Sequence, residues 1–295
     1  MLHKTLTLGI AALACTLFTA QTAQAEELNW AGCGISKKAF MSEMAKVYEE
    51  EKGVKINLQG GGATKGIRNT ADGSTDIGGS CRHAIPTPAE KGVKMTPIAW
   101  DALVVITHPE NPVNNITHED LKKVFSGEIK NWKELGGNDA AIEVFARKGK
   151  ISGVGLVSRE LIFGNTDIDF AATEEFKSTG PLEKKLEQSP NAIALDGISS
   201  ARKRNLKFLS LNGVEPSKEN IISGEYILFR PLYVVTAKKA SDKVKEFLKF
   251  AKSSKGQEVI SSQGTVTLAE GKSLWKKYVK NMATVTGENK SLFEE

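Results

Sequence analysis

Cysteine and histidine are scarce in this chain, which has three and four of them among its 295 residues. Cys33 and Cys81 lack a Cys-x-x-Cys spacing, and no histidine lies at a familiar metal-ligand spacing from them. Two thiols cannot complete a tetrahedral zinc site by themselves. We therefore expect no metal site, and we likewise expect no cofactor.

Two other patterns are missing. The 40 Lys and Arg residues outnumber the 35 Asp and Glu residues by only five, and no basic stripe is interleaved with aromatic residues. This argues against nucleic acid as a partner. No pair of residues suited to acid–base catalysis stands out either. The sequence therefore favours a binding protein over an enzyme.

Long apolar runs are absent except at the start of the chain. The run from Leu6 to Ala20 follows the basic Lys4, is short for a membrane span, and leads to Ala23-Gln24-Ala25, which has the small-x-small form of a cleavage site. We predict that residues 1–25 are a signal peptide cleaved after Ala25 and that the protein is exported to the periplasm. A retained anchor helix is the alternative.

The chain does have three short segments rich in glycine and hydroxyl residues, namely 60–66, 78–82 and 147–155. Each follows a strand-like run, and the first and third lead into helix-like runs. Such turns aim backbone N–H groups and the positive end of a helix at one point. With the charge of Arg147 or Arg82, three converging turns predict a pocket for a small dianion. A salt-bridge role is the alternative for Arg82.

The order of the expected elements is that of an α/β protein. Strands alternate with helices from the first strand onward, which indicates a parallel sheet covered by helices. Ser36 is expected to cap the first helix, and residues 173–189 are expected to be helical with a break at Gly180-Pro181.

Two long extended runs, 95–108 and 226–236, have the length of strands that cross between two lobes. Pro231 makes the second of them an edge strand or a connector rather than a central strand. We predict that the chain leaves the first lobe and later returns to it, with boundaries at 26–103 for the first part of lobe 1, 104–232 for lobe 2 and 233–295 for the return segment of lobe 1.

Five segments spread over nearly the whole of the remaining chain form a pattern that is longer than the glycine turns alone. They are 53–62, 76–80, 124–132, the Ser152-Gly153 loop, and 212–216 continuing to 223–226 and 230–233. With them the chain resembles the phosphate-binding branch of the periplasmic solute-binding proteins.

The resemblance implies a two-lobed α/β periplasmic binding protein fold with a mixed, mostly parallel sheet in each lobe and a two-stranded hinge. The lobes would close over one tetrahedral oxyanion, phosphate or arsenate, in a monomer that serves a membrane ABC permease. The implied ligand contacts are Gly34, Ile35, Ser36, Ala63, Thr64, Ser80 and Cys81 in lobe 1 and Arg147, Ser152, Gly153 and Val154 in lobe 2.

Several positions depart from the family pattern. Ala63 replaces a common serine and Val154 a common threonine, which leaves only backbone donors there. The spacing from Arg147 to Ser152 is one residue longer than usual, so Lys148 falls where the family arginine would. We favour Arg147 because its planar fork can make two bonds to one oxyanion.

Cys81 stands where phosphate binders often have an aspartate. Such an acceptor distinguishes hydrogen phosphate, which has an O–H donor, from sulfate, which has none at neutral pH. A thiolate would accept well, and nearby arginine and helix ends favour that form. One hypothesis is therefore that Cys81 tunes the pocket toward arsenate; a disulfide or thiol pair between Cys33 and Cys81 is the alternative.

Three function classes remain. The first is a transport receptor for a phosphate-like anion, and the second is a sensory binding protein that docks on the ectodomain of a membrane histidine kinase. A thiol redox enzyme ranks last, because Cys33 and Cys81 are 48 residues apart and no histidine is clearly positioned as a base.

Overall fold

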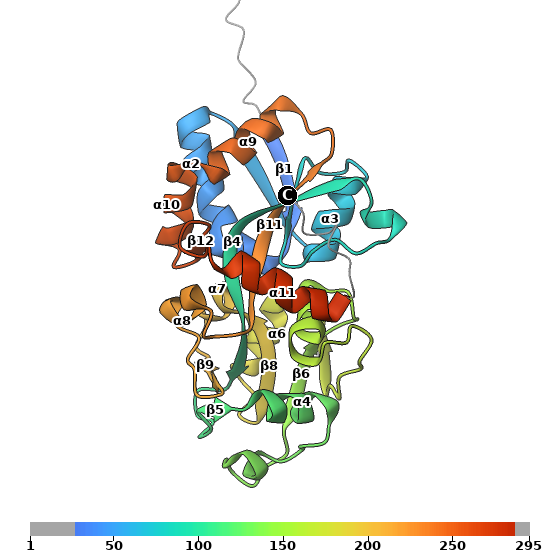
Figure 1. Ribbon diagram of the computed structural model, residues 1–295, viewed down its shortest axis with the longest axis vertical. Coiled ribbons are helices and arrows are strands. Elements are labelled where there is room, and N and C mark those ends of the chain that lie inside the picture. Colours follow the sequence, from blue (N-terminus) through green and yellow to red (C-terminus); the bar gives the residue numbers. More distant parts are fainter. Residues whose placement is uncertain (1–26, 287–295) are drawn as a thin grey trace, which may run out of the picture.

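Figure 1 shows the computed structural model of the protein, which describes residues 27–286. The predicted signal peptide and its cleavage after Ala25 lie outside the described residues. The molecule is elongated and has an upper and a lower half in this view, joined by strands near its middle. Within residues 27–286, no helix is both long and apolar enough to cross a membrane.

One mixed sheet runs through both halves, in the order β2-β1-β3-β11-β4-β8-β6-β7. Strands β9 and β12 pair with β4, and β5 pairs with β10 separately. The strands are β1 Glu27–Gly32, β2 Lys55–Gly60, β3 Ile77–Ser80, β4 Val93–Thr107, β5 Asn115–Ile116, β6 Glu143–Arg147, β7 Glu174–Phe176, β8 Ala192–Gly197, β9 Lys207–Phe208, β10 Ser210–Leu211, β11 Phe229–Ala237 and β12 Val266–Thr267.

The prediction of a separate sheet in each lobe is wrong, and the reason is the length of β4. This strand has 15 residues. Its first part pairs with β11, and its last part, from Leu103 to Thr107, pairs with β8. Pairing is parallel at both ends of the sheet, among β1, β2 and β3 and among β6, β7 and β8, and antiparallel at its centre.

The two predicted crossing strands exist and pair with each other. Strand β11 is not an edge strand, since it lies between β3 and β4. Pro231 is tolerated because it lies opposite Trp100 of β4 but outside the stretch Tyr233–Val235 that pairs with β3. At Pro231, β11 therefore has a neighbouring strand on one side only. The lobe boundaries that we drew around these crossings stay a prediction.

Helices cover both faces of the upper half (Figure 1). Helix α1, the π-helical turn η1 and α2 form one continuous helix. Ser36 does not cap it as predicted, because the helix begins at Gly34 and the Cys33 side chain accepts from the Ser36 N–H. The bounds are α1 Gly34–Ser36, η1 Lys37–Met41, α2 Ser42–Lys52, α3 Ala63–Ala71, η2 Pro88–Glu90, α9 Asp242–Lys252 and α10 Ser254–Ser262.

The remaining helices belong to the lower half or to its junction with the upper half. They are α4 His118–Ser126, η3 Trp132–Leu135, α5 Gly153–Ser158, η4 Arg159–Phe163, α6 Thr179–Leu186, α7 Ile198–Ala201 and α8 Lys218–Ser223. The predicted helix over 173–189 is wrong in its first part, where β7 forms. Gly180 and Pro181 do not break a helix but lie in the first turn of α6, where a missing N–H costs nothing.

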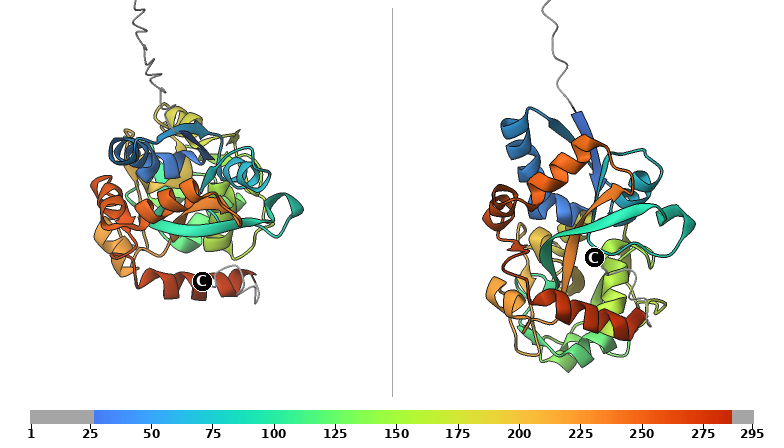
Figure 2. Two further views of the ribbon diagram at one scale, coloured as in Figure 1. Left: turned by 90° about the horizontal axis from the view of Figure 1, so that it is seen from above. Right: turned by 45° about the horizontal axis from the view of Figure 1, so that its top comes forward.

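Helix α11, Leu274–Thr286, lies across the junction of the two halves in Figure 1, and the left view of Figure 2 shows it along one side of the molecule. Its Trp275 and Tyr278 rings pack edge-on against Trp100 of β4, at centroid distances of 5.8 and 6.0 Å. Leu274 and Tyr278 are fully buried. The return segment therefore covers the crossing strands rather than the first half alone.

Candidate functional site

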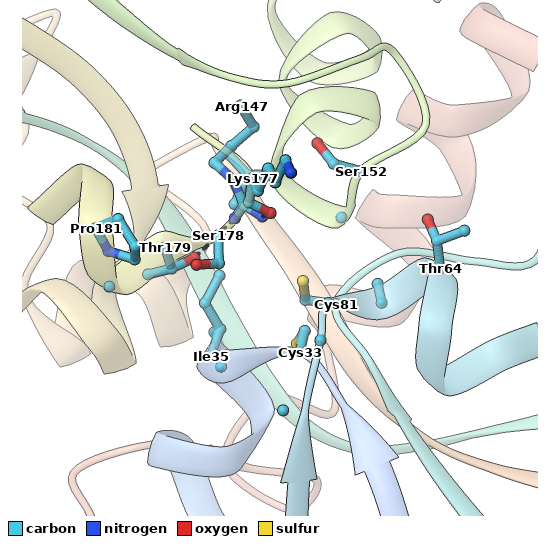
Figure 3. A pocket seen from close by; sticks show the side chains of 18 of the residues that line it. Cys33, Ile35, Thr64, Cys81, Arg147, Ser152, Lys177, Ser178, Thr179 and Pro181 are labelled. Carbon is cyan, nitrogen blue, oxygen red and sulfur yellow. Dashed lines mark hydrogen bonds between the residues drawn. The ribbon is translucent and has the colours of Figure 1, made fainter. Parts of the chain in front are cut away.

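A cavity of about 480 Å³ lies between the two halves, beyond the carboxyl ends of β1, β2 and β3. This is the edge of an open α/β sheet where ligands usually bind. Figure 3 shows its side chains. The cavity is lined by Cys33, Gly34, Ile35, Lys38, Gly60, Gly61, Gly62, Ala63, Thr64, Cys81, Arg147, Lys148, Ile151, Ser152, Gly153, Val154, Lys177, Ser178, Thr179, Gly180, Pro181 and Arg204.

The first half supplies backbone donors from the starts of two helices. Gly34 and Ile35 form the first turn after β1, and Ala63 and Thr64 form the first turn of α3 after β2. N–H groups in a first turn have no partner within their helix. Gly62 precedes α3 with φ 92°, a conformation that favours glycine and turns the chain sharply into the helix. Gly34, Ile35, Ala63 and Thr64 all line the cavity, and their contact with a ligand stays a prediction.

The second half faces them with the start of α5. The Ser152 side chain accepts a hydrogen bond from the Gly155 N–H at 3.1 Å and so caps this helix. The N–H groups of Gly153 and Val154 lie in the first turn at the cavity wall. Ser152, Gly153 and Val154 therefore lie where the sequence placed them, on the opposite side of the cavity from α3.

Arg147 lines the cavity at the end of β6, but its guanidinium is also bound to its own half. Nη1 donates to Thr179 Oγ1 at 2.8 Å, Nη2 donates to the Lys177 carbonyl at 2.8 Å, and Nε donates to the Phe176 carbonyl at 3.3 Å. Arg147 thus fixes the segment that leads into α6. The neighbouring Lys148 also lines the cavity and is exposed. Which of the two contacts a ligand stays a prediction.

Sequence reasoning missed the part of the wall formed by the start of α6. Ser178, Thr179 and Gly180 line the cavity at the N-terminal end of this eight-residue helix. Pro181 could have indicated that a helix starts here, because proline is common in the first turn of a helix and does not require a break. Figure 3 shows Ser178 and Thr179 across the cavity from Thr64.

Five cationic side chains line the cavity, and no Asp or Glu is among its lining residues in the described part of the chain. Two of them share one buried carboxylate: Lys38 Nζ lies 3.0 Å from Glu183 Oε2, and Arg204 Nε lies 3.2 Å from the same oxygen. The others are Arg147, Lys148 and Lys177. The lining therefore carries an excess of positive charge that a bound anion would balance.

Cys33 and Cys81 form the floor of the cavity as free thiols, so no disulfide joins them. Their side chains are hydrogen-bonded to each other. Burial raises the pKa of Cys33, but hydrogen bonds with Cys81 and Ser36 outweigh it and lower this pKa to about 7. The hydrogen bond with Cys33, together with burial, raises the pKa of Cys81 well above its usual value. Cys33 is therefore the more readily ionised thiol of the pair.

Two predicted contact residues lie beneath the floor and do not line the cavity. The Ser36 hydroxyl lies 3.0 Å from Cys33 Sγ and donates to the Ser80 carbonyl. The Ser80 hydroxyl donates to the Arg82 carbonyl at 2.6 Å. Below them, Arg230 of β11 is fully buried, and its Nη1 donates to the Cys81 carbonyl at 3.1 Å. Ser36, Ser80 and Arg230 therefore support the cysteines rather than the ligand space.

The two halves touch each other on both sides of the cavity. On one side, Arg82 Nε and Thr64 Oγ1 both donate to the Ile151 carbonyl, at 2.9 and 3.1 Å. Arg82 also makes the salt bridge that was its alternative role, with Glu90 at 2.7 Å. On the other side, the Lys38–Glu183 pair joins η1 to α6. These contacts hold the halves together around an enclosed space.

The geometry suits one kind of ligand. Backbone N–H groups from three helix starts and five cations surround the space, while within residues 27–286 no cluster of three His, Cys, Asp or Glu residues could hold a metal ion. Helix starts and arginine are the groups that bind small oxyanions in proteins. The lining of the cavity therefore suits a small anion above a thiol floor.

Comparison with known proteins gives the same answer. A family model described as the PBP superfamily domain matches residues 19–255. The phosphate-binding protein PstS of Borreliella burgdorferi is 32% identical over 262 residues, which covers 84% of this chain and 92% of that protein. The PstS of Bacillus subtilis is 27% identical over 248 residues, covering 83% of this chain and 82% of that protein.

Solved structures agree in fold. A putative phosphate ABC transporter substrate-binding protein from Clostridium perfringens, solved with bound phosphate, superposes with a TM-score of 0.75 at 27% identity, covering 82% of this chain and 99% of that one. An ABC-type phosphate transport receptor from Vibrio cholerae has a TM-score of 0.64 at 27% identity, covering 82% of this chain and all of that one.

Proposed function

Because the chain belongs to the PBP superfamily and, within it, to the PstS family of phosphate-binding proteins, we propose that it is the phosphate-binding receptor of an ABC phosphate transporter. Proteins of this family bind and deliver a solute and are not enzymes. A receptor of this kind works outside the cytoplasm; a periplasmic location, the signal peptide and a monomeric state are the finer parts of the proposal.

One observation carries the proposal: donors from both halves face a single cavity that has cations and no acidic residue in its described lining. An anion in this space would accept from the first turns of α1 and α3 on one side and from the first turn of α5 on the other. It would also neutralise the charges of Arg147, Lys148 and Lys177. Binding would thereby strengthen the contact between the halves.

We propose that hydrogen phosphate is distinguished from sulfate by the thiol floor. Hydrogen phosphate has one O–H group that needs an acceptor, and a site that supplies an acceptor rejects an anion without that proton. The Cys33 thiolate, with its pKa lowered to about 7, is the acceptor in this lining. Hydrogen arsenate also has one O–H group and would be accepted by the same site. Arsenate sensing and docking on a receptor kinase stay predictions.

Calorimetric titration of the reduced protein with phosphate and with sulfate tests this function. We expect one phosphate per chain with a dissociation constant near or below about 1 μM, which corresponds to roughly −8 kcal/mol. Sulfate should bind at least about tenfold more weakly, a difference of roughly 1.4 kcal/mol. Absence of phosphate binding would refute the transport proposal. Equal binding of sulfate would refute only the role of the thiol floor.

A further inference from the structure

The backbone places the two cysteines side by side. Strands β1 and β3 are parallel neighbours, with Gly32 paired to Gly79. Cys33 follows β1 directly, and its N–H donates to the Gly79 carbonyl at 3.0 Å. Cys81 follows the last residue of β3. Two residues 48 positions apart in the sequence therefore bring their thiols within hydrogen-bonding distance of each other.

Both thiols face the ligand space. Figure 3 shows the Cys81 sulfur pointing toward the middle of the cavity, with Cys33 just below it. Cys81 is only 1% and Cys33 only 4% exposed, and both line the cavity. Opposite them lies Gly153, where an added Cβ would stand 2.4 Å from the Cys81 sulfur. The absence of a side chain at Gly153 is what lets α5 pack closely against this sulfur.

The pair has the reactivity of a dithiol rather than of two structural cysteines. A buried cysteine in apolar surroundings is inert because burial disfavours its thiolate. Here the Cys33 sulfur lies 3.3 Å from the Ser36 nitrogen, whose N–H donates to it, and 3.0 Å from the Ser36 hydroxyl. These donors, with the positive charge of Arg230 below, favour a thiolate at Cys33. A nucleophilic sulfur and a second thiol thus share one cavity floor.

The charges around the floor decide which thiophilic species can enter. Thiolates prefer soft elements. The cavity is lined by five cations, Lys38, Arg147, Lys148, Lys177 and Arg204, which oppose the entry of a soft metal cation. A soft element that arrives as a neutral hydroxide meets no such repulsion. Trivalent arsenic is present in neutral water as arsenous acid, which is uncharged and small.

We propose that Cys33 and Cys81 form a binding site for trivalent arsenic, taken up as arsenous acid. Two As–S bonds form and two As–O bonds break, so that As(OH)3, the Cys33 thiolate, the Cys81 thiol and one proton from the solvent give a dithiolate As–OH adduct and two water molecules. The Cys81 proton and the solvent proton leave in those waters, arsenic stays trivalent, and no oxidant or reductant is needed. In the described chain the protein supplies two sulfur ligands here, and the third position keeps the hydroxyl.

This inference goes beyond phosphate transport and does not rest on it. The adduct would occupy the space above Cys81, at the centre of the cavity where an oxyanion would lie. Arsenous acid and phosphate should therefore exclude each other. The phosphate would use helix starts, cations and the acceptor on the thiol floor proposed above, whereas the arsenic would use only the two sulfurs.

The test uses the exported chain, reduced with a phosphine and freed of reductant before arsenite is added. Intact-mass measurement should show one arsenic atom per chain, and alkylation should find Cys33 and Cys81 both protected. Cys33→Ser and Cys81→Ser should each weaken retention at least about tenfold, because one sulfur alone cannot chelate. Phosphate titration of the arsenite-treated protein should show no binding.

Three results would overturn the proposal. One is that no arsenic is retained by the reduced protein; a second is that the double variant C33S/C81S retains as much as the parent. The third is a disulfide that persists after reduction, seen as a mass two hydrogens lower. If the serine variants do not fold, the alkylation protection of the parent chain decides the matter. Failure of phosphate binding in the untreated protein would count against the transport function and not against this site.

Discussion

Arg147 connects β6 to the start of α6 through three hydrogen bonds from its guanidinium, and the same side chain lines the cavity. We predict that Arg147→Ala lowers the affinity for phosphate by at least roughly 2 kcal/mol, as the loss of a buried charged partner does. The variant loses the charge and also the hydrogen bonds that hold Lys177 and Thr179. Calorimetric titration with phosphate measures the change.

Lys148→Ala is the matched control, because Lys148 is the next cation along the chain and is exposed. It should change the affinity less than Arg147→Ala and should act mainly on the association rate and its salt dependence. If Lys148→Ala had the larger effect, the ligand-binding cation would be the lysine, and Arg147 would have only a structural role.

Gly153 is the closest point between the cysteine floor and α5. A methyl group there would lie 2.4 Å from the Cys81 sulfur and 3.1 Å from the Ala63 Cβ. We predict that Gly153→Ala keeps the halves from closing fully and weakens phosphate binding at least about tenfold, with little change in melting temperature. A filter-binding assay with labelled phosphate and a thermal melt measure the two effects.

Gly180→Ala provides the comparison, since a methyl group at Gly180 would meet no atom within 4 Å. Its effect on affinity should be clearly smaller than that of Gly153→Ala. Equal losses in the two variants would mean that steric closure against Cys81 does not limit binding.

The residues of the cavity were predictable to different degrees. The position of Ala63, Thr64 and Ser152 at the cavity was predictable from the glycine-rich segments that contain them, because a strand followed by glycine and a helix is a local pattern. Lys38 and Arg204 were not predictable, since they meet at Glu183 only after distant segments fold together. The pairing of Cys33 with Cys81 was an open alternative, and β-strand register settled its geometry.

The loop after β3 and the helical turn η4 are linked by a pair of buried side chains. His83 Nε2 lies 2.7 Å from Glu160 Oε1, and both residues are buried. Burial lowers the pKa of His83, but the hydrogen bond and the charge of Glu160 raise it more, against the opposing charge of Arg82. The net pKa therefore lies above the ordinary 6.5. Tyr233 and Tyr278 are the other titratable groups near Glu160.

A raised pKa gives this pair a definite pH dependence. Its stabilising effect is complete below the unfolded pKa of 6.5 and is lost as the pH rises through the higher folded pKa. We predict that the melting temperature of the parent protein falls more steeply between about pH 6 and pH 9 than that of His83→Gln, so that the two curves converge at high pH. Parallel curves would show that His83 does not carry a proton in the folded state.

The elements of the chain were predicted best where the signal is local. Thr117 caps α4 by accepting from the Asp120 N–H, a contact between residues only three positions apart. Two predictions near helix starts were wrong. The Cys33 side chain caps the first helix in place of Ser36, and Pro181 lies in the first turn of α6 and does not break a helix.

Across the molecule, the α/β class followed from the alternation of strand-like and helix-like segments, and the crossing strands followed from the two extended runs 95–108 and 226–236. The single continuous sheet did not follow from the sequence. Its continuity depends on which strands lie beside β4, and neither Leu103 nor Phe229 reveals its neighbour locally. The position of α11 across the junction depends in the same way on contacts with Trp100 that span some 175 residues of sequence.

A crystal structure of the reduced protein grown with phosphate tests most directly whether both halves enclose one anion. We predict phosphorus density in the cavity, within hydrogen-bonding distance of N–H groups from the start of α3 in one half and the start of α5 in the other. Density bound to one half alone, or an empty cavity at saturating phosphate, would contradict the account.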